Sequence, residues 1–254
     1  MSEISVCIPT YEFNGEGVKF LSELFNSLEK QTFQDFDIVI SDHSKDDNIY
    51  KFCKDSSEEF EITYIRNENG RGYQSTNTNC VLQNAEGRIL KLIYQDDLFV
   101  DNQALKKIKN TFDKSNCKWL FHGFTHTTDG IETHRNCIPE WTEMMLEGNN
   151  HLGSPSCVAF LNEYVIDMDE NIKLLIDTEL YHRMRMEHGI PEFISDILIA
   201  NREHANRVSA GGIDYNAVMQ SSDGKQWMVN KEELQHVYEK HKDFFILKRY
   251  PDEN

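Results

Sequence analysis

Short apolar runs alternate with amphipathic stretches along the first half of the chain. The runs that predict buried strands are residues 4–8, 36–41, 62–66 and 89–94. Helical spacing of apolar residues predicts helices at residues 18–31, 48–56, 74–84 and 102–114. This alternation of strands and helices favours an α/β fold with a mostly parallel sheet.

The second half follows a less regular pattern. Strands are predicted at residues 119–124, 157–161 and within 192–200. Helices are predicted at residues 140–147, 174–187 and 231–245, and a polar loop at 202–212. No linker, internal repeat or low-complexity segment interrupts the pattern, which favours one continuous domain over residues 1–254.

Polar residues directly follow three of the predicted strands. Thr10 and Tyr11 come after the first strand, and Asp42 comes after the second. Asp96 and Asp97 come after the fourth. Ligands of parallel α/β sheets bind beyond the carboxyl ends of the strands. The sequence therefore predicts a binding site that these three clusters form together.

The charge of the chain limits the kinds of ligand that it can bind. Its 254 residues include 26 basic and 43 acidic side chains, for a formal net charge of −17. This balance argues against binding of nucleic acid, whose phosphates need a basic surface, and against attachment to anionic lipid. A small anionic ligand would need local compensation from a metal ion, a helix N-terminus or a few placed cations.

The cysteines and the lack of long apolar runs indicate a cellular setting. The six cysteines lie apart, form no CxxC pair and have no spacing typical of a zinc site. We find neither a signal peptide nor an apolar run of about 20 residues, the length that spans a membrane. We therefore expect a protein of the reducing cytoplasm whose thiols serve as core side chains.

Four segments occur in the order and spacing of a known set of motifs. The first runs from ISVCIPTY to SDHSKDD at residues 4–47, and the second from RNENGRGY to LIYQDD at residues 66–97. The third is IDTELYHRM at residues 176–184, and the fourth is REHANRVS at residues 202–209. Over roughly residues 3–210 the chain resembles the family 2 glycosyltransferases, which use nucleotide-sugar donors.

The resemblance implies a fold and a division of labour along the chain. The fold is of the GT-A type, with a Rossmann-like, mostly parallel central sheet flanked by helices and a less regular second half on the acceptor side. Residues 1–115 then form the nucleotide-sugar-binding half and residues 116–212 the acceptor and catalytic half. Residues 213–254 form a C-terminal helical extension.

Asp96 and Asp97 match the acidic metal motif of the family. The resemblance implies that Asp97 holds Mg²⁺ or Mn²⁺ and that Asp96 contacts the ribose or sugar of the donor. Such an ion offsets the charge of the diphosphate and stabilises it as a leaving group. Tyr94 stands where the first Asp of the common D-x-D-D form often lies. The alternative is an acidic turn that caps the helix predicted from Asn102.

The end of the first strand matches the nucleotide site of the family. We expect Pro9 to end this strand, and the resemblance implies that Pro9, Thr10 and Tyr11 flank the base and the ribose. Asp42, after the second strand, then accepts the N3–H of uracil. Alternatively, Asp42 closes an Asx turn with Ser44.

Two further groups are candidates for the donor site. Arg71, in the Gly-bearing loop of residues 67–73, is expected to approach ribose or phosphate, and Asn79 is expected to position this loop through backbone hydrogen bonds. The turn of Ser154, Pro155 and Ser156 resembles the turn that lines the donor and acceptor sites. The alternative for this turn is an ordinary proline turn.

The third segment supplies the candidate catalytic base. Inverting sugar transfer needs a carboxylate that accepts the proton of the attacking hydroxyl group. Aligning Arg183 with the arginine of the family places Asp177 at the base position and Ile176 where a Glu is common. Glu179 lies about 200° further around a helix, so we expect an i,i+4 ion pair with Arg183 and only a lining role. The alternative for Asp177 is a helix N-cap.

The fourth segment carries a histidine and two arginines. The resemblance implies that His204 closes over the metal and the diphosphate, and imidazole is a suitable ligand for Mn²⁺. Arg202 and Arg207 are expected to add positive charge. The alternative is a solvated polar loop.

Together these features predict an inverting, metal-dependent glycosyltransferase of polysaccharide biosynthesis. Its donor is a nucleotide-sugar, with UDP favoured, and its acceptor is a hydroxyl group of a glycan or a lipid-linked glycan. One alternative is a nucleotide-sugar-binding protein with little or no catalysis, which Tyr94 and Ile176 would favour. A nucleotidyltransferase ranks last, because it needs a Gly-rich basic loop where this chain has PTYEF.

The final predicted helix leaves one question about partners open. We expect this helix to pack against the core, and contact with the inner face of a membrane or with a second copy of the chain stays an alternative.

Overall fold

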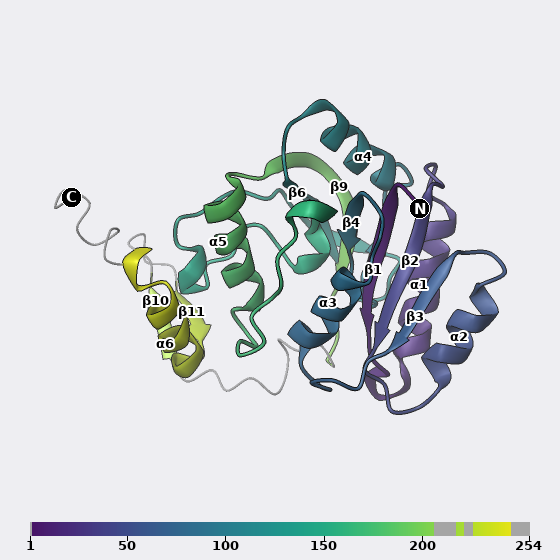
Figure 1. Cartoon of the computed structure of the whole chain (residues 1–254), viewed down its shortest axis with the longest axis horizontal. Coiled ribbons are helices and arrows are strands. Elements are labelled where there is room, and N and C mark those ends of the chain that lie inside the picture. Colours follow the sequence, from purple (N-terminus) through teal and green to yellow (C-terminus); the bar gives the residue numbers. More distant parts are fainter. Residues whose placement is uncertain (1, 206–216, 221–225, 245–254) are drawn as a thin grey trace.

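The first four strands form a parallel sheet in the order β3-β2-β1-β4. The computed structural model describes residues 2–205, 217–220 and 226–244. The four strands are β1 (Ile4–Thr10), β2 (Phe36–Asp42), β3 (Ile62–Arg66) and β4 (Ile89–Leu92). They confirm the predicted parallel α/β arrangement of the first half (Figure 1).

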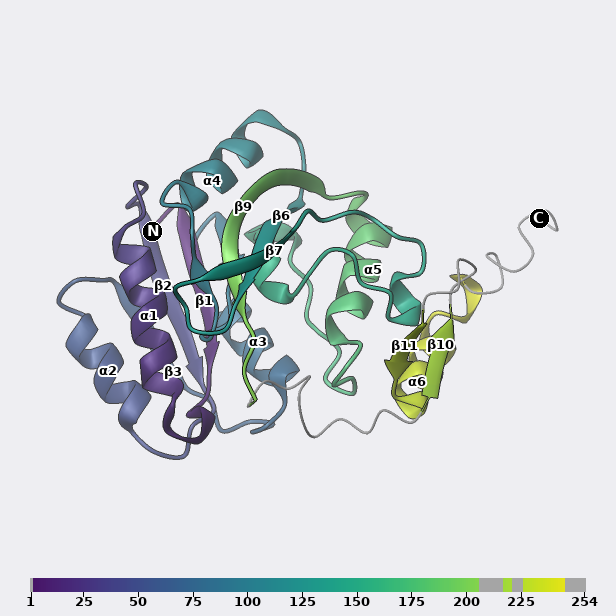
Figure 2. The same ribbon diagram turned by 180° about the vertical axis from the view of Figure 1, so that it is seen from behind.

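Helices cover both faces of this parallel sheet. The helices are α1 (Gly17–Glu29), α2 (Asn48–Ser56), α3 (Gln74–Gln83) and α4 (Ala104–Lys114). Comparison of Figure 1 with Figure 2 places α1 on one face and α3 on the other. All four helices begin and end within two residues of their predicted boundaries, because an apolar stripe of helical period is a local signal.

The second half continues the same sheet. These strands are β5 (Leu98–Phe99), β6 (Trp119–Thr127), β7 (Thr133–Cys137), β8 (Val158–Leu161) and β9 (Glu192–Arg202). β8 runs antiparallel between β4 and β6, and β9 runs parallel to β6. β1–β4, β6 and β9 therefore share one direction, and β5, β7 and β8 run the other way. The expected mostly parallel sheet is confirmed, whereas the short β5 and the polar β7 gave no apolar run to predict them.

The remaining elements lie toward the C-terminus. They are α5 (Ile176–His188), α6 (Lys231–Lys240) and the hairpin of β10 (Ala217–Gln220) and β11 (Gln226–Val229). Short 3-10 turns occur at Phe13–Gly15, Met145–Glu147, Pro155–Cys157 and Asn162–Tyr164. The helix predicted at residues 140–147 is wrong. Only its last turn forms, as the 3-10 turn Met145–Glu147, and Gly148 ends this turn in the left-handed conformation at φ 86°.

β1 continues through Pro9 and Thr10, where the sequence predicted its end. Pro9 pairs with Ser41 of β2. On the other side, β4 ends at Leu92 opposite Cys7, so no neighbouring strand needs the N–H that Pro9 lacks. The longer strand places Thr10 and the following Tyr11 firmly at the carboxyl end of the sheet.

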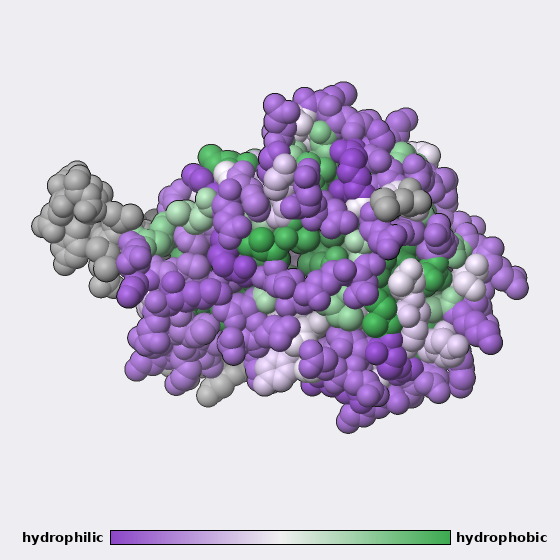
Figure 3. Space-filling view, viewed as in Figure 1, coloured by the Kyte–Doolittle hydropathy of each residue, from purple (hydrophilic) through white to green (hydrophobic). Residues whose placement is uncertain are grey.

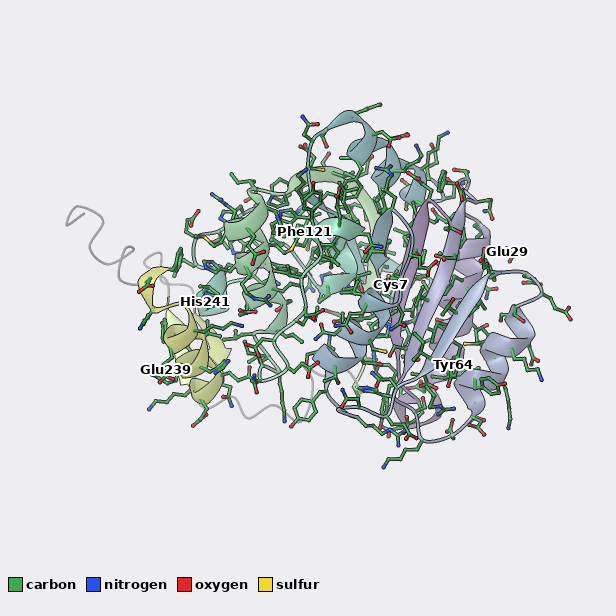
Figure 4. The ribbon with its side chains drawn as sticks, viewed as in Figure 1. Cys7, Glu29, Tyr64, Phe121, Glu239 and His241 are labelled. Carbon is green, nitrogen blue, oxygen red and sulfur yellow. The ribbon has the colours of Figure 1, made fainter. Side chains whose placement is uncertain are left out.

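Polar residues dominate the surface, and apolar residues fill the sheet and its helices. Figure 3 shows hydrophilic residues over most of the visible face. Cys7 and Phe121, labelled in Figure 4, are fully buried in the core. All six cysteines lie in the described part of the chain and are free thiols. Within residues 2–205, 217–220 and 226–244, no helix is both long and apolar enough to cross a bilayer.

Candidate active site

A cavity of about 850 Å³ lies beyond the carboxyl ends of β1 and β4. Its walls also include the start of α3, the start of α5 and the end of β9, so both halves of the chain form it. The expected site residues that line it are Pro9, Thr10, Tyr11, Asp96, Asp97, Ser154, Pro155, Asp177 and Arg202. The acidic pair after β4 and the candidate base therefore face one space.

Asp97 is a buried carboxyl group that the end of β9 holds in place. Its Oδ1 accepts the backbone N–H of Arg202 at 2.8 Å, and its Oδ2 accepts a hydrogen bond from Asn201 at 2.9 Å. Burial, together with the charge of Asp96, raises the pKa of Asp97 to about 8. A nearby cation would favour the ionised form of this carboxyl group.

Asp96 pairs with His204 at the edge of the cavity. The distance from Asp96 Oδ2 to His204 Nε2 is 2.9 Å. The His204 ring packs against Phe13 and Phe20, with ring centroids 5.5 and 5.0 Å away, and lies outside the cavity lining. The structure thus pairs His204 with Asp96, whereas the resemblance implied a ligand pair of His204 and Asp97.

Arg202 is the last residue of β9 and is buried, although we expected it in a polar loop. Its Nε donates to the backbone carbonyl of Asp96 at 2.8 Å, and its guanidinium forms an ion pair with Glu23 of α1. Glu23 therefore compensates part of its charge, but Arg202 also lines the cavity, and its expected role toward a diphosphate stays a prediction. Arg207 lies outside the described residues.

Asp177 lies in the first turn of α5, whose N-cap residue is Leu175. Its Oδ2 accepts a hydrogen bond from Asn150 at 2.9 Å, and its Oδ1 accepts the backbone N–H of Thr178 at 2.8 Å. Burial raises the pKa of Asp177 to about 6 against the effect of these hydrogen bonds. A carboxylate with a pKa near neutrality suits a general base, and the alternative of an N-cap does not match its position.

Asn77 of α3 holds the end of β1, although sequence analysis singled out Asn79 instead. Asn77 Nδ2 donates to the carbonyl of Thr10 at 3.0 Å, and its Oδ1 accepts the hydroxyl of Ser41 at 2.6 Å. Asn79 exchanges two hydrogen bonds with the backbone of Met168, at 2.7 and 3.0 Å. Asn79 therefore holds the segment around Met168, whereas we expected it to position the Gly loop of Arg71, and it lies outside the cavity lining.

Two further amides at the site were not predicted. Gln95, just before the acidic pair, accepts the backbone N–H of Tyr11. Asn201 donates to Ser154 Oγ at 2.6 Å in addition to its bond with Asp97. Both amides line the cavity. In the sequence, Gln95 directly precedes Asp96 and Asn201 directly precedes Arg202, and this adjacency was the only signal that could have found them.

Asp42 does not contact the cavity, contrary to the expected role at the donor base. It is fully buried and lies outside the cavity lining. Its Oδ1 accepts the backbone N–H of Ser44 at 2.8 Å, and its Oδ2 accepts the hydroxyl of Tyr64 at 2.7 Å. The Asx turn with Ser44, the alternative, is what forms. His43, the next residue, lines the cavity instead.

Arg71 and Ser156 also lie outside the cavity lining. Arg71 forms an ion pair with Glu68 at 3.7 Å. The hydroxyl of Ser156 accepts the backbone N–H of Tyr94 at 2.9 Å, and its carbonyl accepts a hydrogen bond from the buried Lys91. Burial lowers the pKa of Lys91 to about 7. Ser156 therefore holds Tyr94, which does line the cavity, through this hydrogen bond.

Glu179 is fully buried on the side of α5 away from the cavity. Arg183 Nε donates to both of its carboxylate oxygens, at 2.8 and 2.9 Å, which confirms the predicted i,i+4 pair. Lys240 and His241 approach Oε1 at 2.8 and 2.9 Å. Burial favours a higher pKa, but the hydrogen bonds from His241 and Arg183 hold the pKa of Glu179 at about 2. The expected lining role of Glu179 is therefore wrong.

The donor groups of the site fit a divalent ion in part. Asp96 and Asp97 provide carboxylate oxygens, and His204 provides an imidazole nitrogen, which are ligand types of Mg²⁺ and Mn²⁺. A cation beside the buried Asp97 would offset the burial and the charge of Asp96 that raise its pKa. In the described part of the chain, however, no three His, Cys, Asp or Glu side chains gather in a metal-holding arrangement.

Comparison with solved structures supports the fold. TarS from S. aureus, residues 1–349, has a TM-score of 0.63 and 19% identity, and the match covers 79% of this chain and 60% of TarS. The same fragment in complex with UDP-GlcNAc gives 0.62 and 18%, over 80% and 59% of the two chains. The mannosyltransferase PcManGT from Pyrobaculum calidifontis, in complex with GDP-Man and Mn²⁺, gives 0.56 and 12%, over 79% and 56%.

The match to TarS covers most of this chain but only part of the TarS fragment. The chain spans about 60% of the length of the TarS fragment. The likeness confirms the expected GT-A fold. A comparison with curated proteins gave no match. The sequence model described as glycosyl transferase family 2 matches residues 5–166, more than half of the chain. The chain therefore belongs to glycosyl transferase family 2.

Proposed function

We propose that this glycosyltransferase moves a sugar from a UDP-linked donor to an acceptor hydroxyl group by a single inverting displacement. The observation that carries the proposal is that Asp177 and the pair of Asp96 and Asp97 line one cavity. A displacement needs a base for the acceptor and charge compensation for the departing diphosphate in the same space. This cavity supplies residues for both.

The donor would lie along the carboxyl ends of β1 and β4. Thr10, Tyr11 and Asp96 line this part of the cavity, and Asn77 and Gln95 hold the end of β1 rigid. The complexes of TarS with UDP and with UDP-GlcNAc support a UDP-linked donor. The complex of the mannosyltransferase with GDP-Man makes a GDP-linked donor the natural second choice for testing.

Mg²⁺ or Mn²⁺ would bind at Asp97, with Asp96 and His204 beside it. When bound, the ion would neutralise the diphosphate and stabilise it as a leaving group. The Mn²⁺ in the mannosyltransferase complex supports this assignment. Asp97 is buried beside the charge of Asp96, so a cation bound there would favour the ionised form of this carboxyl group.

Asp177 would act as the catalytic base. Its carboxylate takes the proton of the acceptor hydroxyl while that oxygen bonds to the anomeric carbon. The bond from this carbon to the diphosphate breaks, and its electrons leave with the diphosphate. Asn150 and the backbone N–H of Thr178 fix the direction of the carboxylate. The acceptor would be a glycan or a lipid-linked glycan, and the six free thiols suit a reducing cytoplasm.

The proposal is tested by thermal shift and by turnover. We expect UDP and UDP-sugars to raise Tm only with Mn²⁺ or Mg²⁺ present. Asp97→Asn should remove the metal-dependent shift and lower turnover by about 100-fold or more, as loss of a leaving-group contact does. Asp55→Asn, which changes an exposed carboxylate on α2, is the control and should keep both.

Two results would overturn this assignment. A protein that responds to no nucleotide-sugar, with or without metal, does not bind the proposed donor. Normal metal-dependent turnover in Asp97→Asn would remove the metal from this residue.

A further inference from the structure

The C-terminal helix α6 lies against α5, the helix that carries Asp177 (Figure 1). It begins after Asn230, whose side chain accepts the backbone N–H of Glu233 at 2.9 Å. Leu234 and Val237 of α6 are buried. This helix lies outside residues 5–166, the part of the chain that matches the family model.

The carboxylate of Glu233 holds the segment that leads into α5. This segment, residues 173–175, is named here the entry segment. Glu233 Oε1 accepts the N–H of Lys173 at 2.7 Å, and Oε2 accepts the N–H of Leu174 at 2.8 Å and of Leu175 at 3.3 Å. Three consecutive backbone donors therefore point at one carboxylate.

Glu233 is the third residue after Asn230, the N-cap residue of α6. An Asn N-cap with Glu three residues later is the pattern of a capping box, in which the Glu serves its own helix. Glu233 instead reaches across to a different helix. Leu175, the N-cap residue of α5, has an apolar side chain that cannot supply a capping oxygen. A carboxylate also suits the positive end of the α5 dipole.

The entry segment is part of the cavity wall. Lys173 and Leu174 line the cavity together with Ile176 and Asp177, which follow directly. The Lys173 ammonium lies 4.6 Å from the centroid of the Tyr73 ring, at the start of α3. Movement of the entry segment would therefore displace the wall that carries the candidate base.

Two ion-pair groups fix α6 on either side of the entry segment. Asp169 faces His236 at 3.2 Å and also pairs with Lys240. Glu179 faces Lys240 at 2.8 Å and His241 at 2.9 Å. Figure 4 labels His241 at this junction. Both acidic partners are almost completely buried, so they hold α6 at a defined position over the entry segment.

We propose that Glu233 is a positioning residue for sugar transfer. It holds the entry segment so that the carboxylate of Asp177 meets the acceptor hydroxyl, and it touches neither donor nor acceptor. This inference rests on the proposed function, in which Asp177 is the base. A misplacement of about 1 Å at a reacting group lowers rates by up to about 100-fold, so a support of this kind has a measurable effect.

The donor contacts predict how the effect divides between binding and turnover. The donor lies at the ends of β1 and β4, which Asn77 and Gln95 hold without α6. Loss of Glu233 should therefore lower kcat and leave the Kd of UDP with Mn²⁺ unchanged. A residue that only stabilised the fold would not separate the two quantities.

The test compares Glu233→Ala and Glu233→Gln with Glu239→Ala. Glu239 accepts a hydrogen bond from Gln235 on the same helix, so its loss removes the same charge at a different place. UDP release from UDP-GlcNAc, the Kd of UDP with Mn²⁺ and amide hydrogen exchange at residues 173–178 are measured for each variant. We expect Glu233→Ala to lower kcat about tenfold and to speed exchange in the entry segment.

Glu233→Gln should fall between Glu233→Ala and the wild type, because its amide keeps one acceptor oxygen. It also decides the question if Glu233→Ala fails to fold. Equal kcat in the Glu233 variants and Glu239→Ala, or unchanged exchange at residues 173–175, would overturn the proposal. If the wild type releases no UDP, that result counts against the proposed function, and the exchange measurement alone decides the positioning role.

Discussion

Three buried carboxyl groups in this protein differ in acidity because their surroundings differ. Burial raises the pKa of Asp97 to about 8 and of Asp177 to about 6. Glu179 is buried as well, but hydrogen bonds from His241 and Arg183 keep its pKa at about 2. The basic side chains of Arg183 and Lys240 thus keep Glu179 ionised, and this carboxylate joins α5 to α6. The other two face the cavity, where a ligand or a metal ion can change their state.

The acidity of Asp177 predicts a pH profile. A base must be ionised, so the rate should fall as pH drops through the pKa of about 6, by about tenfold per unit below it. Asp177→Asn should remove this limb and lower turnover by at least about 100-fold, because general-base catalysis contributes that much. Turnover from pH 5 to pH 8 and the Kd of UDP with Mn²⁺ are the measurements.

The same variant separates an enzyme from a binding protein. Asp177→Asn should still bind UDP with Mn²⁺, since the proposed donor site lies at the ends of β1 and β4. If Asp177→Asn turns over at the rate of the wild type, the catalytic base is a different residue. Donor binding without any hydrolysis or transfer in the wild type would support the non-catalytic alternative.

At the scale of helices and strands, hydrogen bonds near the ends of these elements hold the cavity residues in place. The longer β1 brings Thr10 to the cavity, and Asn77 of α3 holds it there. The buried Lys91 of β4 binds the carbonyls of Ser156 and Val158 and so fixes the turn before β8. The interface of α5 and α6 depends on Glu179 in a similar way. Each contact joins an element to one that is distant in sequence.

Glu179 should make stability at the interface of α5 and α6 depend on acid. Its pKa of about 2 lies below the ordinary value of 4.5, so its contribution is complete above pH 4.5 and is lost as pH falls toward 2. Glu179→Gln should lower the free energy of unfolding at pH 7 by about 2 kcal/mol, because it removes charge-assisted hydrogen bonds to the partly exposed Arg183 and Lys240. The measurement is urea unfolding at pH 7 and at pH 3.

Glu187→Gln is the control for this prediction, since its carboxylate lies more than half exposed on the same helix. It should change stability little at either pH. A gap between Glu179→Gln and the wild type that stays constant from pH 7 to pH 3 would contradict the assigned acidity of Glu179.

At the scale of the whole molecule, one sheet carries the site. Within the described residues, nine strands form this sheet, and both halves of the chain contribute to it. The cavity therefore combines the ends of β1 and β4 with the start of α5 and the end of β9. The chain carries a formal net charge of −17, so an anionic donor needs local positive charge to bind.

The net charge also predicts which anions are excluded. We expect no saturable binding of duplex DNA at about 0.15 M salt, because a polyanion meets repulsion over the whole surface. UDP with Mn²⁺ should bind in the same buffer, since one ion compensates a small diphosphate. Fluorescence anisotropy with labelled DNA makes the comparison, and saturable DNA binding that weakens with salt would contradict this view.

Much of the fold follows from patterns within short windows of sequence. The helices of the first half match their predicted boundaries closely, and the strands between them were expected at the correct places. The polar β7 and the two-residue β5 escaped prediction because they form only by pairing with β6 and β9. The predicted helix at residues 140–147 forms only the 3-10 turn Met145–Glu147, because tertiary context can override a short local pattern.

The sequence by itself determined the order of the elements, the family, and the acidic residues after β4 and at the start of α5. It could do so because periodicity and motif spacing are local properties of the chain. Only the tertiary structure decided which polar groups reach the cavity, and it turned Asp42 and Glu179 away from it. It also joined Glu233 to Lys173, 60 residues apart, and Asn201 to Asp97, 104 residues apart. Burial and hydrogen bonding of this kind arise between segments that meet only when the sheet and helices have packed.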